Sequence, residues 1–415
     1  MKNSSVFSLT VFVAALGYFV DIYDLQLFNL VAEKSLVGIG ITDPKLLAEY
    51  GYKLFLWQMG GMLAGGLLWG ILGDKKGRKS ILFGSILLYS VANILNGFVT
   101  DLTQYEAVRF LAGLGLAGEL GAAITLVSEV MDKQSRGWGT MVIVTVGALG
   151  AVAANLIAKG MDWRISYYIG GGLGLALLAL RVGTFESTMF AKVRDSAVRK
   201  GDFLSLFKSR ERALRYLACI MVGLPVWFVI GILIKFAPVF AKATGVDGAA
   251  SAGDAIMYAY IGLSVGDLLS GAASQWTASR RKVVVAYLIG CAALTVAYVF
   301  VQGLSLGAFY VLCLLLGAAT GYWALFVTIA AEQFGTNIRA TVTTTVPNFV
   351  RGAVIPITLG YKALEPTQGA VTAGLIVGGI CVALAMISIL SLRETFGREL
   401  DYVEGEEPAG APAHG

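Results

Sequence analysis

The chain has 415 residues, of which 57% are hydrophobic and only 14% are charged, with a net charge of +5. A soluble domain carries about 25% charged residues, so this composition excludes an ordinary soluble enzyme and predicts a membrane protein. The only histidine, His414, lies in a polar tail, and the four cysteines are isolated in apolar runs. A histidine-based active site, a metal centre, a disulfide framework and a cofactor are therefore not expected.

The first apolar segment, at 6–32, is long enough to cross a bilayer, which takes roughly 20 residues. It follows Lys2 but lacks a small-residue cleavage site, so we expect a retained span rather than a secretory signal. Two acids, Asp21 and Asp24, lie well inside it, and their spacing of three places them on one helix face. Acids within a membrane are costly and usually functional.

Further apolar segments follow along the chain, and each is expected to be a helix because an open sheet would leave backbone groups unpaired in lipid. The twelve expected spans are 6–32, 49–73, 80–100, 104–131, 137–159, 165–184, 213–242, 254–279, 282–302, 305–331, 338–362 and 368–391. Most of the 32 basic residues then fall on the side of the two termini, notably at 75–79 and 280–282. This bias predicts a protein of the cytoplasmic membrane with both termini in the cytoplasm.

One long polar connection, at 185–212, divides the spans into six and six. The halves resemble each other, because Glu129 stands seven residues before Arg136 and Glu332 stands seven residues before Arg339. Such duplication is typical of secondary transporters, which hold their substrate between the halves. The expected units are an N-terminal six-helix bundle (1–184), a cytoplasmic linker (185–212), a C-terminal six-helix bundle (213–391) and a polar cytoplasmic tail (392–415).

Five motifs resemble those of a known family. GILGDKKGRKS at 70–80 resembles the loop signature of the major facilitator superfamily, and VRFLAGLGLAG at 108–118 resembles a fourth-span motif of its proton-coupled members. SEVMDKQSRG, AEQFGTNIRAT and RETFGREL resemble further motifs of sugar porters and of related metabolite–proton symporters. The resemblance covers both halves and implies an all-α membrane protein with twelve transmembrane helices in two pseudo-symmetric six-helix bundles, working by alternating access.

Three departures from the family patterns narrow the function. FESTMF at 185–190 replaces the proline-containing motif that follows the sixth span. The seventh span, GLPVWFVIGIL, lacks the paired glutamines with which sugar porters hold sugar, and the fifth span lacks the Gly-Pro pair of drug–proton antiporters. Sugar is therefore not favoured as the substrate, and export of drugs is less favoured than import.

The acids within the spans are the expected proton-coupling residues. Asp24 and Arg109 are expected at one depth, and the resemblance places them where related carriers have a protonatable acid and its arginine partner. Asp21 shares the face of Asp24, and Glu119, with no evident cation at its depth, is a candidate second proton site or substrate contact. The alternatives are a permanent Asp24–Arg109 pair that joins helices and a structural, hydrogen-bonded Glu119. For Asp267, a role in helix packing and a role in proton coupling are equally expected.

The expected substrate contacts lie near the middle of their spans. Arg351 and Asn348 share one face of the eleventh span, and the fork of an arginine matches a carboxylate. Tyr322 and Trp323 stand where related carriers have a cavity-lining tryptophan, and Gln58 is a weaker candidate. The alternatives are an internal acid such as Asp267 as the partner of Arg351, and a packing role for the two aromatic residues.

The resemblance also implies a gate at the cytoplasmic ends of the helices. An aspartate such as Asp74 is favourable at a helix N-terminus, and Gly77 allows a tight turn after it. The expected gating residues are Gly70, Asp74, Gly77, Arg78, Glu129, Arg136, Glu332 and Arg339. The alternative for the loop at 74–79 is a solvated, charged loop without a gating role.

The sequence thus predicts a secondary active transporter that imports a small polar metabolite together with protons. An organic acid is narrowly favoured over a sugar or a polyol, because Arg351 and Lys235 are available and the sugar glutamines are absent. The alternatives are a proton-coupled exporter of organic solutes and, from a different class, a membrane receptor or enzyme. The expected partners are the solute, protons and the lipid bilayer, with no nucleic acid, and the chain is expected to be a monomer.

Overall fold

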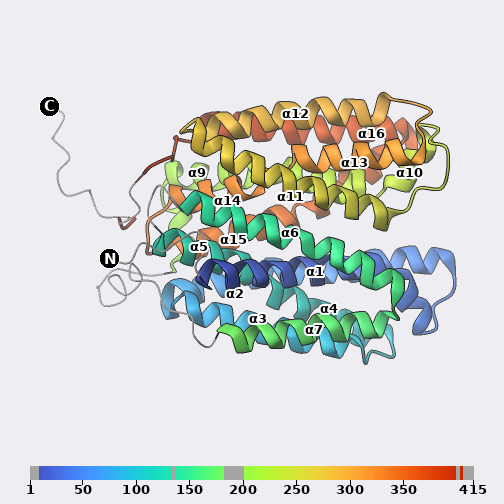
Figure 1. Ribbon diagram of the computed structural model, residues 1–415, viewed down its shortest axis with the longest axis horizontal. Coiled ribbons are helices and arrows are strands. Elements are labelled where there is room, and N and C mark those ends of the chain that lie inside the picture. Colours follow the sequence, from blue (N-terminus) through green and yellow to red (C-terminus); the bar gives the residue numbers. More distant parts are fainter. Residues whose placement is uncertain (1–8, 132–135, 182–200, 399–401, 405–415) are drawn as a thin grey trace.

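The computed structural model describes residues 9–131, 136–181, 201–398 and 402–404, and this part of the chain is built of helices without a β-sheet (Figure 1). The first half contains α1 (Leu9–Gly38), α2 (Pro44–Lys76), α3 (Arg78–Asn96), α4 (Leu102–Leu116), α5 (Glu119–Val130), α6 (Arg136–Gly160) and α7 (Trp163–Leu180). The second half contains η2 (Phe203–Phe207), α9 (Arg210–Phe228), η3 (Val229–Ile234), α10 (Ala237–Ala243), α11 (Ala252–Trp276), α12 (Arg280–Phe300), α13 (Leu306–Ala319), α14 (Trp323–Gln333), α15 (Arg339–Gly352) and α16 (Val354–Ser391).

As far as the described residues reach, each expected span lies on one helix or on two or three successive helices, because several spans are broken. The fourth divides into α4 and α5 at Ala117 and Gly118, and the tenth divides into α13 and α14 just before Trp323. The last two spans are separated by a kink at Gly369, whose φ of 77° favours glycine. The breaks create helix ends inside the bundle, where backbone N–H groups need partners.

The helices form two groups that lie on either side of a shared boundary (Figure 1). In the first half α1 packs on α6 and α7, and α3 packs on α4 and α7; in the second half α11 packs on α13, and α9 packs on α16. The halves meet where α6 contacts α11 and where α2 and α5 contact α15. The boundaries expected for the linker and the tail remain predictions, because much of both lies outside the described residues.

The helices run between two ends of the molecule. α1 begins and the described chain ends at the left in Figure 1, which we call the inner end, and the opposite end is the outer end. Helices that start at the outer end have side-chain caps: Asp43, Asp101 and Asp162 accept from backbone N–H groups of α2, α4 and α7. Ser251 and Ser305 do the same for α11 and α13. These caps replace hydrogen bonds that the first turn of a helix lacks.

The outside of the helices suits lipid. Nine helical stretches of the described chain are long and apolar enough to cross a membrane, and Ser80–Asn96 is a shorter apolar helix. Large apolar side chains such as Phe98, Leu156 and Ile387 are more than half exposed. Extensive apolar surface of this kind is unfavourable in water and favourable in a bilayer, so the chain is a multi-pass membrane protein.

Candidate functional site

A cavity of about 20 Å³ lies between the halves and is lined by charged and aromatic side chains. Its lining residues are Tyr18, Ile22, Ala148, Val226, Trp227, Ile230, Tyr260, Leu263, Trp323 and Arg351. They come from α1 and α6 of the first half and from α9, η3, α11, α14 and α15 of the second. A space of this size holds about one water molecule, so a larger solute fits only after the halves move apart.

Arg351, the cation in this lining, pairs across the halves with Asp21, and both side chains are fully buried. Its Nη2 lies 3.4 Å from Oδ2 of Asp21 and 3.4 Å from the hydroxyl oxygen of Tyr18. Its guanidinium carbon lies 6.0 Å from the ring centroid of Trp323. Nε of Arg351 and Oδ1 of Asp21 have no hydrogen-bond partner in the described chain. The pair is therefore long and incompletely satisfied.

Asp267 is not the internal partner of Arg351 that the sequence offered as an alternative. Its Oδ1 accepts a hydrogen bond of 2.9 Å from the backbone N–H of Ala324. It thereby caps α14 at the break in the tenth span, where free N–H groups favour a carboxylate. This contact joins α11 to α14 within the second half, and the other carboxylate oxygen of Asp267 has no hydrogen-bond partner in the described chain.

Asp24 and Arg109 are both fully buried in the first half but do not form an ion pair in the described structure. A Cβ at Gly170 of α7 would lie 2.2 Å from Oδ1 of Asp24, whereas the guanidinium of Arg109 lies 5.9 Å from the ring centroid of Tyr167, three residues earlier on α7. The guanidinium also lies 4.6 Å from the ring centroid of Phe28. No hydrogen bond or ion pair joins Asp24 to Arg109 in the described structure, and their pairing during transport stays a prediction.

Both groups nevertheless lie against one face of α7 and both lack hydrogen bonds. The two carboxylate oxygens of Asp24 and all three guanidinium nitrogens of Arg109 are without partners in the described chain. Phe28, whose ring Arg109 contacts, stands four residues beyond Asp24 on α1, which is about one helical turn.

Glu119 has a cation partner, contrary to the expectation from the sequence. Arg181 at the end of α7 donates from Nη1 to Oε2 of Glu119 over 2.9 Å and from Nη2 to Oε1, and both side chains are fully buried. A Cβ at Gly17 of α1 would overlap both groups, so the glycine lets α1 pass over the pair. Arg181 is not among the residues expected at the site, because it stands at the end of an apolar run next to the basic linker.

Of the expected substrate contacts, Trp323 and Arg351 line the central cavity, whereas Tyr322, Gln58 and Asn348 do not. The hydroxyl of Tyr322 donates over 3.0 Å to the carbonyl of Val222 within the second half. The amide of Gln58 is buried in α2 without a hydrogen-bond partner in the described chain. In this conformation neither Tyr322 nor Gln58 lines the central cavity.

Asn348 instead joins the halves. Its Nδ2 donates over 2.8 Å to the carbonyl of Ala117, one of the groups exposed by the break between α4 and α5. The close approach depends on glycine, because a Cβ at Gly66 would lie 3.1 Å from Cβ of Asn348. Asn348 is thus part of the contact between halves rather than of the cavity lining.

Asp74 ties α2 to the start of α15 at the inner end. Its carboxylate accepts from the backbone N–H of Ala340 (3.0 Å) and from the backbone N–H and hydroxyl of Thr341 (2.8 and 2.7 Å). A Cβ at Gly70 would lie 2.9 Å from Cα of Thr341, so this glycine lets the two helices touch. Gly77 turns the chain into α3 with a φ of +100°, which favours glycine.

A second contact between the halves is the ion pair of Glu129 and Arg339. The two side chains are fully buried, and Nη1 of Arg339 lies 3.1 Å from Oε1 of Glu129. Glu332 pairs with Arg280 of the same half, at 2.7 and 3.0 Å. The expected gating residues Arg78 and Arg136 have side chains that lie outside the described residues.

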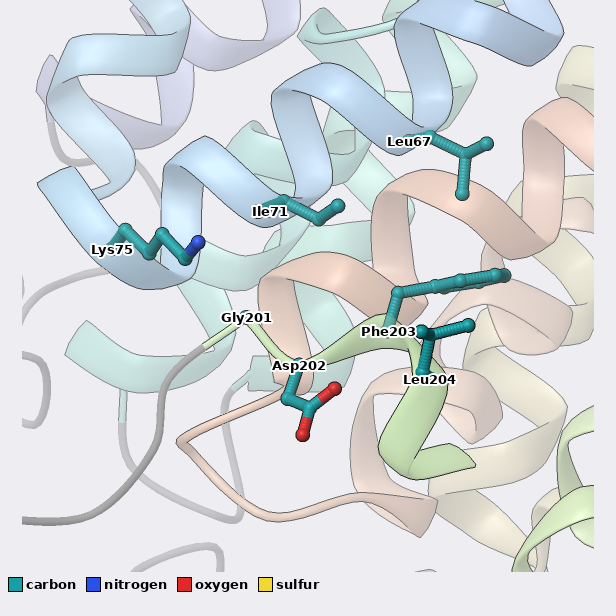
Figure 2. Close-up of a pocket in the computed structure, with 7 residues that line it drawn as sticks. All are labelled: Leu67, Ile71, Lys75, Gly201, Asp202, Phe203 and Leu204. Carbon is teal, nitrogen blue, oxygen red and sulfur yellow. The ribbon is translucent and has the colours of Figure 1, made fainter. Parts of the chain in front are cut away.

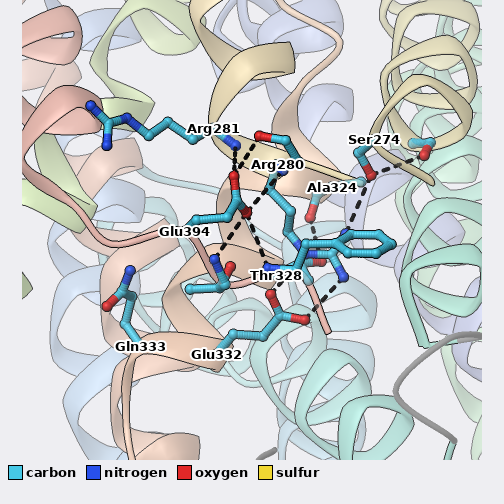
Figure 3. Close-up of polar contacts among 12 residues, drawn as sticks. Ser274, Arg280, Arg281, Ala324, Thr328, Glu332, Gln333 and Glu394 are labelled. Atoms are coloured by element: carbon cyan, nitrogen blue, oxygen red, sulfur yellow. Dashed lines mark hydrogen bonds and ion pairs between the residues drawn. The ribbon is translucent and has the colours of Figure 1, made fainter. Parts of the chain in front are cut away.

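Glu394, in the RETF motif, holds the start of α12 at the inner end (Figure 3). It accepts from the hydroxyl of Ser279 (2.5 Å) and from the backbone N–H groups of Arg280 (3.0 Å) and Arg281 (3.2 Å). Burial opposes ionisation, but these hydrogen bonds and one from the N–H of Phe396 lower the pKa of Glu394 below its usual value. The carboxylate therefore stays charged at the helix N-terminus, which favours an anion.

Larger hollows lie near the ends of the molecule, and two of them exceed 500 Å³. One, of about 540 Å³, lies at the inner end between α2 and η2 and is lined by Leu67, Ile71, Lys75 and residues 201–204 (Figure 2). It contains none of the buried acids. The other, of about 780 Å³, lies at the outer end between α1 and α2 of the first half and α16 of the second. The inner end is closed by Asp74 and by the Glu129–Arg339 pair, so the conformation is closed inward.

Comparison with known proteins agrees with this architecture. Among solved structures, the MFS proton:xylose symporter XylE bound to 6-bromo-6-deoxy-D-glucose matches with a TM-score of 0.74, covering 96% of this chain and 98% of that chain at 17% identity. The two-bundle, twelve-helix fold expected from the sequence is thereby confirmed.

Curated relatives cover almost the whole chain. It is 27% identical over 413 residues to the "Probable 4-methylmuconolactone transporter" of Cupriavidus pinatubonensis, covering 96% of this chain and 92% of that protein. It is also 27% identical over 398 residues to the "3-(3-hydroxy-phenyl)propionate transporter" of Escherichia coli, covering 93% and 95%. The chain is therefore a transporter rather than an enzyme. Residues 5–357 match the family model of the Major Facilitator Superfamily, and the chain belongs to that superfamily.

Proposed function

We propose that the chain imports a small organic acid together with protons, by exposing the cavity between its halves alternately to the two sides of the membrane. The observation that carries this proposal is the buried Arg351–Asp21 pair in the wall of that cavity. An arginine binds a carboxylate through two parallel N–H···O hydrogen bonds. The relative that transports 3-(3-hydroxy-phenyl)propionate, a carboxylate with an aromatic ring, supports the same class of solute.

In the proposed cycle, Asp21 and the solute carboxylate compete for Arg351. An ionised Asp21 neutralises the guanidinium and leaves no charge for an anion to bind. A proton on Asp21 removes that partner, so Arg351 binds the solute carboxylate while the total charge in the cavity stays the same. Proton and anion are thus taken up together, and the rings of Trp323 and Tyr18 contact the apolar body of the solute.

Asp24 and Arg109 are proposed to form the second part of the coupling. A buried carboxylate without a partner is costly when charged, and binding a proton removes that cost. Arg109 lies against the same face of α7 and stabilises the carboxylate once the proton leaves. Glu119, which Arg181 already neutralises, is the weaker candidate for proton coupling.

The orientation is part of the proposal. The inner end faces the cytoplasm, with both termini there, because the basic residues of the connections gather on that side. The protein acts as a monomer in the cytoplasmic membrane, since one chain supplies both halves of the cavity.

Uptake into proteoliposomes tests this function. We expect labelled 3-(3-hydroxy-phenyl)propionate to accumulate when the outside is acidic, and to stop accumulating when a protonophore dissipates the gradient. Protein-free vesicles measure the passive entry of the weak acid, and the corresponding amide is the neutral control. Accumulation equal to that of protein-free vesicles across a panel of aromatic carboxylates would overturn the proposal, and protein-dependent uptake of a polyol would redirect it to a neutral solute.

Asp74→Asn is expected to slow uptake several-fold without changing the KM for the solute. The change removes the charge that caps α15 and weakens the inward-closed conformation, because charge-assisted hydrogen bonds contribute about 1.5–3 kcal/mol. Initial rates over a range of solute concentrations measure both parameters.

Asp101→Asn is the matched control for this variant. Asp101 also caps a helix, but it accepts from the N–H of Gln104 within α4, and in the described part of the chain no hydrogen bond or ion pair joins its side chain to the second half. Equal slowing of both variants, or wild-type turnover in Asp74→Asn, would argue that Asp74 belongs to a charged loop without a gating role.

A further inference from the structure

The hollow at the outer end has the shape and lining of a small-molecule site. Its volume is about 780 Å³, within the usual range for ligand pockets. Both halves contribute, with Phe28 from α1, Tyr52 from α2, Phe236 after η3, and Lys362 from α16. We call this hollow the outer vestibule. It is distinct from the central cavity, whose lining shares no residue with it.

Two lysines of the vestibule lack carboxylate partners. Lys235 follows η3, is half-buried, and its Nζ lies 3.7 Å from the ring centroid of Phe55; Nζ of the exposed Lys362 lies 4.3 Å from that of Tyr52. Within the described chain no carboxylate forms an ion pair with either lysine, and this includes Glu33, the acid in the vestibule lining.

Two other lysines at the outer end have carboxylate partners. Lys53 pairs with Glu106 at 2.7 Å, and Lys159 pairs with Asp254. The vestibule lysines instead rest on aromatic rings, an arrangement that holds an ammonium in place while leaving its charge uncompensated. Two such cations around a half-buried hollow attract an anion and raise its local concentration.

The aromatic residues of the lining indicate the second feature of the ligand, an apolar body. Tyr52 and Phe236 line the hollow with partly buried aromatic rings. Phe28 and Thr358 border it but are almost fully buried, and the hydroxyl of Thr358 donates to the carbonyl of Val354. A small anion with a flat, apolar body satisfies both parts of this lining. Inorganic anions lack the apolar body, and neutral aromatic molecules lack the charge.

The vestibule lies on the outer side of the central cavity. Lys235 is five residues beyond Ile230, which lines that cavity, a separation of roughly 7 Å along a helix. Lys362 is eleven residues beyond Arg351, or roughly 16 Å. A ligand held by the lysines therefore has not yet reached the guanidinium, and the two sites can be separated by mutation.

We propose that the outer vestibule is a second anion site, in which Lys235 and Lys362 hold an aromatic carboxylate before it reaches Arg351. The inference rests on the proposed function for the identity of the ligand. The site's existence, however, is open to measurement without transport.

Calorimetric binding of benzoate to the purified full-length protein tests the site. The starting variant is Arg351→Gln with Asp21→Asn, which removes both charges of the central pair together and leaves no unpaired buried charge. We expect this variant to bind benzoate at the vestibule and not to bind benzamide measurably. Adding Lys235→Gln and Lys362→Gln should weaken benzoate binding at least about tenfold, and high salt should weaken it only while the lysines are present.

Lys242→Gln is the control, because Lys242 is an exposed lysine of α10 outside the vestibule lining and its loss removes one positive charge, as each of the two vestibule changes does. No benzoate binding in the starting variant, or equal binding with and without the vestibule lysines, overturns the second site. Should the starting variant unfold, the same lysine changes in the wild-type background must reduce the number of benzoate molecules bound, or the proposal fails.

These outcomes are separate from those of the transport proposal. Lysine-dependent benzoate binding together with a wild-type protein that accumulates no carboxylate would retain the vestibule site and reject the proposed function. Carboxylate uptake by a protein whose benzoate binding does not depend on either lysine would support the proposed function and reject the vestibule site.

Discussion

Arg351→Gln is expected to weaken binding of the transported acid by about 2–5 kcal/mol, or roughly 30- to 4,000-fold in Kd. The reason is that Arg351 is the cation in the lining of the central cavity and the proposed partner of the solute carboxylate. Glutamine keeps a hydrogen-bond donor of similar length but loses the charge and the two-pronged geometry. The measurement is the affinity for the acid, determined on purified protein at one pH.

The same change also affects folding, and the two effects must be separated. Arg351→Gln leaves Asp21 buried without its cation, and breaking a buried pair costs about 3–5 kcal/mol of stability. Removing both charges with Asp21→Asn avoids that penalty, because a neutral replacement of a buried pair is often tolerated. We expect the double variant to recover the melting temperature of the wild type without recovering affinity at the central site.

The outcome decides between classes of solute. A stable double variant that transports its solute with unchanged affinity would contradict the organic-acid proposal, and a neutral metabolite would then be the favoured substrate. Loss of binding in a protein that melts like the wild type would instead assign the carboxylate contact to Arg351.

The sequence was sufficient for the positions of the spans and for the contact of α2 with the second half. Apolar runs of bilayer length predict helices whatever their neighbours, and the loop at 70–80 carries a motif that located Asp74 near a helix N-terminus. The structure adds that this N-terminus belongs to α15, on the other half. A motif indicates which residues make a contact, but it does not say which of the surrounding helices is the partner.

The partners of the buried charges could not be read from the sequence. Asp267 was a possible partner of Arg351 under the expectation that the tenth span is one continuous helix. The span is broken before Trp323, and a backbone N–H group at the start of α14 donates to Asp267. Such breaks depend on packing and leave no trace in hydrophobicity. Arg181 was missed for Glu119 for a related reason, since an arginine between a span and a basic loop has the same sequence signature whether it points inward or outward.

Asp24→Asn is expected to abolish accumulation of the solute while exchange of solute across the membrane continues. Asparagine resembles the protonated carboxyl group in shape and charge, so the variant keeps the state that binds solute but cannot release a proton. Asp24 is fully buried, and its oxygens have no hydrogen-bond partner in the described chain, so the neutral amide fits without leaving a new charge unpaired. The variant should therefore fold, and the defect should be confined to coupling.

Two assays on the same proteoliposomes distinguish this defect from a general loss of activity. Counterflow, with unlabelled solute inside and labelled solute outside, measures exchange without a proton gradient; uptake driven by an acidic outside measures coupling. Asp254→Asn is the control, because Asp254 is an acid of α11 that pairs with Lys159 at the outer end, away from the central cavity. If Asp24→Asn still concentrates the acid under a pH gradient, the proton is carried elsewhere, and Asp21, which already contacts the cation of the cavity, becomes the remaining acid of the first span that can couple protons to the solute.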